Sequence, residues 1–371
     1  MSASSPTQVA VIGAGLAGAA CSSQLALLGS SVTLFDMGGR GPGGRTSTRK
    51  QAGYQFDHGC QYIQPAEQGH LRGLFKQWQS EGALDEWRGT FGVLDRACGH
   101  WQADQGRTLL VGKPSMDSLV KHLAAQQGIQ QRWAFKVQHL ERLDDGRWLV
   151  HGTQRHPGDD PDEPKTEGPF NAVLLADILT CQSGVGAVEM GDEAAKQLLH
   201  PVGEAIKKSP CFSLMAALHV GSDAAGVSAA SVSGCDALQW IACDSAKPGR
   251  ERTDGMHCWV AVTSEAFARK AMSASGGQPD MDALSKQLLQ KLREALRVIN
   301  PDLTDDQLEA PFAAVQRWGS GFKAECHPEA YIWDPEGRIQ PASSVQQPPR
   351  HQRPPEKSCV GHGNHETCRW L

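Results

Sequence analysis

A glycine-rich turn near the N-terminus constrains the fold of this chain most strongly. Val9–Ile12 is an apolar run suited to a buried parallel strand, and the motif Gly13-x-Gly15-x-x-Gly18 follows it directly. A helical pattern comes next and reaches Gly29, a residue type that commonly ends helices. This order of strand, turn and helix predicts the first unit of a dinucleotide-binding Rossmann fold.

Each glycine of the motif has a physical role in such a unit. Gly13 allows the tight turn, Gly15 lets a pyrophosphate approach the backbone, and Gly18 lets the helix pack against the sheet. The start of the helix offers unpaired N–H groups and a partial positive charge to phosphate. The next apolar strand, Val32–Phe35, ends at Asp36. A carboxylate there can accept hydrogen bonds from ribose hydroxyls and would repel a 2′-phosphate.

A second glycine-rich segment favours FAD over NAD as the dinucleotide. Gly43-Gly44-Arg45-x-x-Thr48 begins seven residues after Asp36. It matches the Gly-Gly-Arg-x-x-Ser/Thr pattern that follows the second strand in one flavoprotein superfamily. Two glycines bring backbone N–H groups to phosphate, and a fixed guanidinium adds a charge-assisted contact. The alternative interpretation is a flexible basic loop.

The rest of the chain alternates between helical and strand patterns. Apolar residues recur at helical spacing in residues 71–78, 116–123 and 281–296. Short apolar runs predict strands at 171–176, 211–220, 238–243 and 257–262. An Asp-Gly pair within residues 143–150 predicts a hairpin. Residues 155–169 are charged and rich in proline, so we expect a solvated loop there.

Composition excludes several classes of function. The chain has 36 Lys and Arg against 41 Asp and Glu, a net charge of −5 that offers no footprint for nucleic acid or an anionic membrane. No apolar run reaches 18 residues, so we expect no transmembrane segment. Eleven cysteines without a Cys-x-x-Cys pair predict free thiols in a reducing compartment. We expect the cytoplasm, or a plastid if the native N-terminus is longer.

The chain resembles the flavin amine oxidase superfamily and, within it, the renalase-like oxidoreductases. Six stretches carry the resemblance in family order over about residues 8–335: Val11–Gly18, Gly43–Arg45, Phe56–Tyr62, Val111–Met116, Phe212–Met215 and Gln316–Trp318. It implies an α/β fold, with a doubly wound Rossmann-type FAD-binding domain and a second, smaller mixed β/α substrate domain. The FAD-binding domain would use residues 1–60, 105–180 and 310–342, and the substrate domain 61–104 and 181–309. We expect residues 343–371 to form a disordered or aberrant tail.

The resemblance also implies which residues hold the cofactor. FAD would lie extended, with its ADP half on Gly13, Ala14, Gly15, Leu16, Gly18 and Asp36, its adenine near Val137, and its pyrophosphate and ribityl chain on Gly44 and Arg45. Gln61 and Tyr62 would approach the isoalloxazine ring, and Trp318 would line the substrate side. Cys60 stands where the family has a small residue such as alanine. We expect a buried inert thiol there rather than a covalent flavin thioether.

The implied activity is FAD-dependent oxidation of a small molecule. A small amine or dihydronicotinamide-type substrate would pass a hydride to the flavin, and O2 is the expected electron acceptor. No catalytic acid or base stands out, because a flavin accepts hydride without one. Two alternatives stay open: a non-catalytic remnant with weak or no flavin binding, and an NAD-dependent dehydrogenase, which the Gly43-Gly44-Arg45 segment argues against.

The C-terminal part departs from the family pattern. These proteins end with a Gly-Asp segment and a helix that faces the flavin, and no Gly-Asp pair follows Trp318. This departure favours the remnant alternative. Cys359-x-x-His362-x-x-His365-x-x-Cys368 contains the residue types that bind zinc. Four ligands within ten residues and without a supporting core do not make a structural site, so we predict no metal.

Overall fold

The computed structural model describes residues 5–325, except 67–68, 105, 155–163, 178–179, 181–187 and 206. The segment where the family Gly-Asp pair is expected, the tail at 343–371 and its Cys/His pattern therefore lie outside the described residues. The domain boundaries expected from the sequence stay a prediction.

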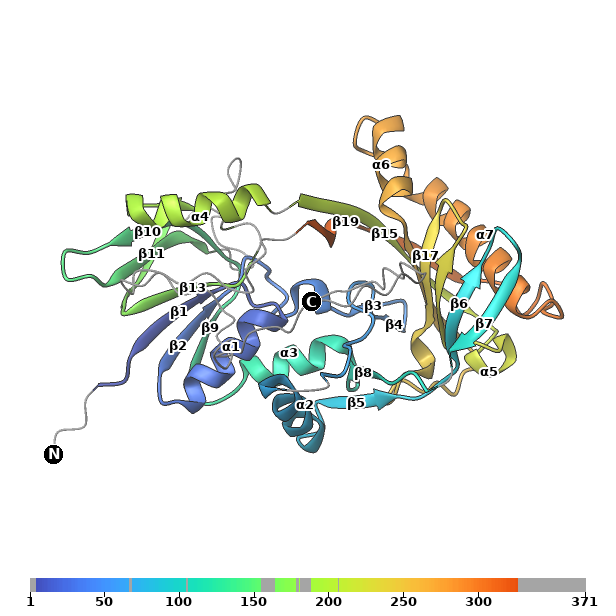
Figure 1. The fold of residues 1–371 in the computed structure, drawn as a ribbon, viewed down its shortest axis with the longest axis horizontal. Helices are drawn as coiled ribbons and strands as arrows, with labels where there is room; N and C mark the ends of the chain where they lie inside the picture. The colour runs from blue at the N-terminus through green and yellow to red at the C-terminus, as the bar shows by residue number, and fades with distance from the viewer. Residues whose placement is uncertain are drawn as a thin grey trace, which may run out of the picture.

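A four-stranded parallel sheet carries the N-terminal glycine-rich turn (Figure 1). Its order is β13 (Ala172–Leu175), β1 (Gln8–Ile12), β2 (Ser31–Phe35) and β9 (Ile129–Arg132). Helix α1 (Leu16–Leu27) joins β1 to β2 and packs against α3 (Met116–Ala124). The central strands are buried on both faces, which suits their apolar sequences. The Rossmann-type prediction is confirmed.

A second sheet packs beside the end of β2. Its order is β12 (Pro164–Phe170), β11 (Trp148–Gln154), β10 (Phe135–Arg142) and β14 (Glu189–Met190). The β10–β11 hairpin turns at Gly146, which has a φ of 83°, as its Asp-Gly pair predicts. The Phe35 ring of β2 meets those of Phe135 and Phe170 edge-on, at centroid distances of 5.1 and 6.0 Å, and joins the two sheets.

The expected solvated loop at 155–169 is wrong for its second part. Residues Pro164–Phe170 form strand β12, which pairs antiparallel with β11. More exposed and less exposed side chains alternate along this strand, but its prolines and charged residues make this pattern hard to recognise in the sequence. As the outermost strand of its sheet, β12 tolerates proline because one row of its backbone groups faces away from the ladder. Residues 155–163 are outside the described residues.

A seven-stranded sheet forms the other large unit (Figure 1). Its order is β19 (Phe312–Glu325), β15 (Lys207–Leu218), β18 (His257–Thr263), β17 (Leu238–Cys243), β16 (Ala229–Ser233), β6 (Phe91–Asp95) and β7 (His100–Asp104). Helices α6 (Glu265–Ala274) and α7 (Met281–Ile299) cover one face, and α7 buries Leu288, Leu292 and Leu296 there. Its opposite face shares a core with the parallel sheet and α3.

Short elements connect these units. They are η1 (Gly44–Thr46), β3 (Arg49–Gln51), β4 (Tyr54–Phe56), α2 (His70–Ser80), β5 (Leu84–Trp87), β8 (Leu109–Gly112), α4 (Glu193–Ala205), α5 (Ser222–Ala225) and η2 (Asp244–Ala246). Strands β3 and β4 form one hairpin, and β5 pairs with β8. The predicted helices at 71–78, 116–123 and 281–296 are confirmed as α2, α3 and α7. Within the described part of the chain, no helix is both long and apolar enough to cross a bilayer.

A buried ionic cluster joins the β3–β4 hairpin to the seven-stranded sheet. Asp57, which follows β4, places its Oδ2 3.0 Å from Lys247 Nζ and 2.6 Å from an Arg250 guanidinium nitrogen. Lys247 Nζ also lies 2.6 Å from Asp244 Oδ1. The four side chains are between 0 and 3% exposed. Two carboxylates and two cations therefore balance one another without access to water.

Neutral groups add hydrogen bonds to this cluster. Thr48 Oγ1 and the Met116 N–H donate to Asp57 Oδ1 at 2.7 and 3.2 Å, and the Asp57 N–H donates to Asp244 Oδ2 at 2.5 Å. Arg250 donates to the carbonyls of Gly112 and Pro114, each at 2.9 Å. Burial alone would raise the pKa of Asp57, but Arg250 and Lys247 hold it below its ordinary value. Burial raises the pKa of Asp244.

Removing one cation of this cluster should destabilise the fold strongly. Lys247→Met leaves two buried carboxylates with one cation, and we expect a loss of about 3–5 kcal/mol in the free energy of unfolding, measured with urea. Lys291→Met, which breaks a partly exposed pair with Glu294, should cost less than about 1 kcal/mol. Adding Asp244→Asn to Lys247→Met should recover part of the loss, because it removes one uncompensated charge. Equal effects of the two single changes would contradict this interpretation.

Candidate functional site

The two glycine-rich segments meet at the start of α1. The Gly43 N–H donates to the Ala14 carbonyl at 2.9 Å, and Gly15 and Gly43 form a bridge of parallel type. Among the described residues, no side chain caps α1 at Gly15, and its first turn holds no acidic residue. The first N–H groups of the helix thus keep their capacity to bind an anion. The structure brings together two motifs that are 28 residues apart in the sequence.

The glycines of the first motif have different surroundings. Gly13 has a φ of 101°, and its N–H donates to the Phe35 carbonyl at 2.9 Å. A Cβ on Gly18 would overlap the Gly13 carbonyl oxygen, so the helix packs against the turn only with glycine there. A Cβ on Gly15 would have no described atom within 4 Å. Gly18 is therefore needed for packing, whereas Gly15 faces space that a ligand can approach.

Asp36 ties the end of β2 to this turn. Its Oδ2 accepts the Ala14 N–H at 2.8 Å, and its Oδ1 accepts the Gly38 N–H at 2.7 Å. Burial raises the pKa of Asp36, and these two N–H donors oppose that rise. Leu16 is the first residue of α1 and is half-buried. Ala14, Leu16 and Asp36 thus lie around the turn, and their contact with the ADP half of a cofactor stays a prediction.

Val137 belongs to the second sheet. Its side chain is buried in the same core cluster as Phe35, and its backbone pairs with Gly152 of β11. The structure therefore places strand β10 next to the end of β2, where Asp36 stands. This arrangement is compatible with an adenine at the Val137 backbone, which stays a prediction.

Three segments hold the residues that follow Asp57. The Cys60 N–H donates to the Arg45 carbonyl at 2.7 Å, and Trp318 Nε1 donates to the His58 carbonyl at 2.8 Å. The His58 ring lies 5.1 Å from the Trp318 indole, centroid to centroid. A Cβ on Gly59 would overlap the Arg45 carbonyl oxygen and reach 3.1 Å from the indole. The second glycine-rich segment, this segment and β19 therefore converge at Gly59.

Two buried polar atoms in this segment have unused hydrogen-bonding capacity. Gln61 Nε2 donates to the carbonyls of Asp57 and Gly59, but Gln61 Oε1 has no hydrogen-bond partner among the described residues. His58 Nδ1 is likewise buried without one in the described part of the chain. Burial and the nearby Arg49 lower the pKa of His58 to about 4, with a smaller effect from Arg40. The sequence analysis missed His58, although its place in the Phe56–Tyr62 stretch was a signal.

The structure also shows the surroundings of the other residues that the sequence analysis named. Arg45 is half-buried in η1, and Trp318 is half-buried on β19. Tyr62 is buried against Trp240 of β17, with ring centroids 5.2 Å apart. Cys60 is buried, and burial raises the pKa of its thiol to about 12, so it stays protonated at neutral pH. An inert Cys60 thiol agrees with this environment.

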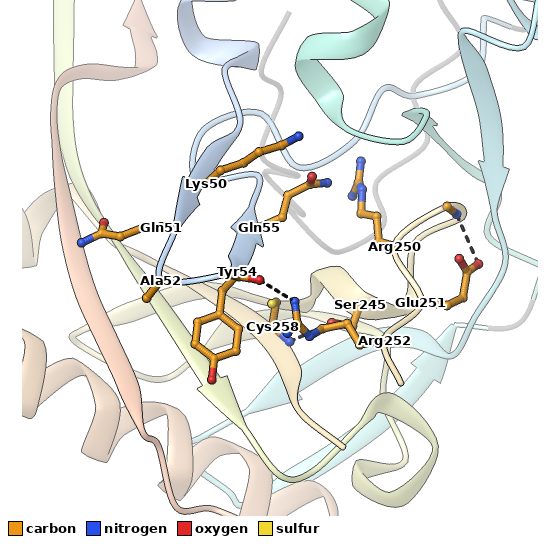
Figure 2. A pocket seen from close by; sticks show the side chains of 12 residues that line it. Lys50, Gln51, Ala52, Tyr54, Gln55, Ser245, Arg250, Glu251, Arg252 and Cys258 are labelled. Atoms are coloured by element: carbon orange, nitrogen blue, oxygen red, sulfur yellow. Dashed lines mark hydrogen bonds between the residues drawn. The ribbon is translucent and has the colours of Figure 1, made fainter. Parts of the chain in front are cut away.

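A separate cavity of about 470 Å³ lies beside the β3–β4 hairpin (Figure 2). Figure 2 shows Lys50 and Gln55 on its hairpin side and Arg250 and Glu251 on the opposite side. The Gln55 amide donates to the Pro114 carbonyl at 2.9 Å, and Arg250 is bonded within the ionic cluster. None of the sequence-predicted site residues lines this cavity. It is therefore distinct from the glycine-rich site.

The described residues contain neither a disulfide nor a group of side chains suited to binding a metal ion. The seven cysteines described, Cys21, Cys60, Cys98, Cys211, Cys235, Cys243 and Cys258, have free thiols. Within the same part of the chain, no three His, Cys, Asp or Glu side chains form a group that could hold a metal ion.

Comparison with known proteins gives one family match. Residues 11–78 match the model of an NAD(P)-binding Rossmann-like domain. The match covers the end of β1, α1, β2 and both glycine-rich segments, and it extends into α2.

Solved structures are similar over nearly the whole chain. A candidate protoporphyrinogen oxidase from Exiguobacterium sp. 255-15 has 12% identity and a TM-score of 0.60, over 87% of this chain and 88% of that one. An oxidoreductase from Methanosarcina mazei has 11% identity and a TM-score of 0.62, over 90% and 94%. Wild-type putrescine oxidase bound to putrescine has 12% identity and a TM-score of 0.56, over 85% and 90%. This chain therefore has the fold of flavin amine oxidase-type oxidoreductases.

Proposed function

We propose that this chain is an FAD-dependent oxidoreductase. The observation that carries the proposal is the contact between the two glycine-rich segments at the uncapped start of α1. A single Gly-x-Gly-x-x-Gly turn serves NAD and FAD alike. The Gly43–Arg45 segment lies next to this turn and adds further backbone groups and a guanidinium. In the proposed complex, these groups would contact FAD between its pyrophosphate and the end that approaches His58–Tyr62.

In this proposal, each part of FAD is assigned to residues of the site. Gly13, Ala14, Gly15, Leu16, Gly18, Asp36 and Val137 would hold the ADP half, and Gly44 and Arg45 the pyrophosphate and ribityl chain. The depressed His58 pKa reflects burial and a positive field from Arg49 and Arg40, which favours an anionic ligand. Gln61 Oε1 is a buried acceptor without a described partner, which suits the N–H edge of a flavin ring. When bound, FAD would supply the capacity to accept a hydride.

Gln61, Tyr62 and Trp318 would then face the flavin and the substrate. The Trp318 indole is fixed by its bond to the His58 carbonyl, and the Tyr62 ring by packing on Trp240. These aromatic groups would orient a small molecule and exclude water from it. We propose a renalase-like reaction, in which the substrate is a small amine or a dihydronicotinamide-type compound and O2 is the acceptor. The fold shared with putrescine oxidase supports the amine.

An NAD-dependent dehydrogenase is the second candidate, because the matching family model is that of an NAD(P)-binding domain. The absorption spectrum of the purified protein distinguishes the candidates. Flavin bands near about 370 and 450 nm would support the FAD enzyme. A colourless protein that binds NADH saturably would support the dehydrogenase. A colourless protein that binds neither would indicate the non-catalytic remnant.

Gly15→Val should abolish flavin binding without unfolding the chain. The new side chain would occupy the space where the pyrophosphate approaches, and no described atom lies within 4 Å of the added Cβ. We expect a melting temperature within a few degrees of the wild type and little flavin in the purified protein. Gly18→Val is the contrasting variant, because its Cβ overlaps the Gly13 carbonyl oxygen, and it should unfold at a lower temperature. Normal flavin content in Gly15→Val would contradict the assignment.

Arg45→Ala should weaken FAD binding by about 1.5–3 kcal/mol, the range for a lost hydrogen bond to a charged group. Arg45→Lys should restore only part of the affinity, because an ammonium cannot reproduce the planar fork of a guanidinium. Titration of flavin-free protein with FAD, followed by flavin fluorescence, measures both effects. Full affinity in Arg45→Ala, or complete rescue by lysine, would place this side chain away from the cofactor.

The buried His58 should make the fold less stable in acid. Its folded pKa of about 4 lies below the ordinary 6.5, so the unfolded chain binds the proton more readily. The stabilisation is complete above pH 6.5 and falls as the pH drops towards 4. Between pH 7.5 and 5 this amounts to about 2 kcal/mol, at about 1.4 kcal/mol per pH unit.

His58→Phe keeps a ring against Trp318 but cannot take up a proton. In urea unfolding, this variant should lose about 2 kcal/mol less than the wild type between pH 7.5 and pH 5. His100→Phe, at an exposed position of β7, should keep the wild-type pH dependence. The assignment of a neutral buried His58 would be wrong if His58→Phe and the wild type showed the same slope.

A further inference from the structure

Arg107 lies against two aromatic rings at the edge of the proposed site. It belongs to the connection between β7 and β8, and its guanidinium carbon is 5.5 Å from the Tyr62 ring centroid and 5.8 Å from that of Trp240. One of its terminal nitrogens donates to the Tyr62 hydroxyl at 3.2 Å. A guanidinium over aromatic faces is held by their negative electrostatic potential. The two rings therefore fix its position.

This guanidinium lacks a counter-charge in the described part of the chain. Arg250 faces Asp57, and even the exposed Arg88 faces Glu86, but no described carboxylate lies within ion-pair distance of Arg107. The side chain is half-buried, so water screens its charge only in part. Of its five N–H donors, one is used by the Tyr62 hydroxyl. Arg107 thus keeps most of its capacity to bind an anion.

Arg107 lies close to the residues that we propose face the flavin and the substrate. Tyr62 ends the segment that follows Asp57 and includes the buried Gln61. Trp240 of β17 lies on the sheet face that shares a core with Tyr62, whereas the next residue, Ile241, packs on the α7 side. Arg107 therefore lies where the proposed flavin-facing segment meets the seven-stranded sheet, on the side away from α6 and α7.

We propose that Arg107 is a specificity-determining residue that binds an anionic group of the substrate, a carboxylate or a phosphate. The inference rests on the proposed function, which puts Tyr62 beside the substrate. A guanidinium held against two rings can still offer a pair of N–H donors to two oxygens of an anion. A substrate without the anion leaves these donors unpaired and binds less tightly, which is the basis of discrimination.

A ligand pair that differs in charge tests this proposal. Benzoate and benzamide have nearly the same shape, and phenyl phosphate tests the phosphate arm. We expect calorimetric titration of the purified protein to show benzoate or phenyl phosphate binding at least about tenfold more tightly than benzamide. The arm with the tighter binding identifies which anion the site prefers. Equal affinities for all three compounds would overturn the proposal.

Variants of Arg107 separate a direct contact from a structural role. Arg107→Gln should lower the affinity for the preferred anion about tenfold or more and leave benzamide binding unchanged. Arg107→Lys should retain part of the discrimination, because the charge remains but the fork is lost. Arg88→Gln removes the same charge from an exposed site and should behave as the wild type. A loss of all three ligands in Arg107→Gln, or unchanged anion binding, would overturn the proposal.

The flavin content of the same samples keeps the two proposals apart. If the wild type contains flavin but does not distinguish benzoate or phenyl phosphate from benzamide, Arg107 has been assigned wrongly and the FAD proposal stands. If the wild type lacks flavin even after addition of FAD, the proposed function fails, and the loss of charge discrimination in Arg107→Gln still decides whether Arg107 binds an anion. If Arg107→Gln does not fold, Arg107→Lys decides the question, because it keeps the charge and removes only the planar fork. Full discrimination between the anions and benzamide in Arg107→Lys would then overturn the proposal.

Discussion

The Asp57 carboxylate is buried between Lys247 and Arg250, and the geometry of the candidate site depends on this contact. Burying charged groups costs several kcal/mol for each ion unless partners surround it. Here one partner, Thr48, is nine residues away, and the others come from two distant parts of the chain: the start of α3 and the η2–β18 connection. The segment that contains Gln61 and Tyr62 begins one residue after Asp57, so its position relative to the seven-stranded sheet follows from the ionic cluster.

A second constraint is electrostatic. The start of α1 lies beside the segment that contains Arg45, and the low pKa of His58 reflects the charges of Arg49 and Arg40 in addition to burial. These positive groups would stabilise a bound diphosphate, and the arginines help to keep His58 neutral. Arg107 would add a separate anion contact beside Tyr62. Cofactor and substrate would thus be held by different cations, at opposite ends of the segment between Arg45 and Tyr62.

Much of the proposed ADP-binding half could be predicted from sequence, because its geometry is local. Gly13, Gly15 and Gly18 lie within one turn, and the Asp36 position follows from a short strand of regular length. The residues that surround the proposed flavin ring were harder to find. His58 and Arg107 have no distinctive spacing, and their roles come from Trp318, 260 residues away from His58 in sequence, and from Trp240. Strand β12 was missed because prolines and charges outweighed its alternation, while its pairing with β11 supplied the missing hydrogen bonds.

Residue types and spacing specify the Rossmann unit, the order of its glycine-rich segments and the helices with a clear apolar period. These features depend on interactions among residues close in the chain, so local patterns are enough to predict them. The folded chain was needed to show that Asp57, Asp244, Lys247 and Arg250 form one buried cluster and that Arg107 lies on Tyr62 and Trp240. Charged residues such as these look like solvated surface groups in a sequence. Their burial depends on opposite charges and aromatic rings that lie far away in the sequence. The short distances between these groups exist only in the folded chain, so sequence spacing cannot predict their electrostatic interactions.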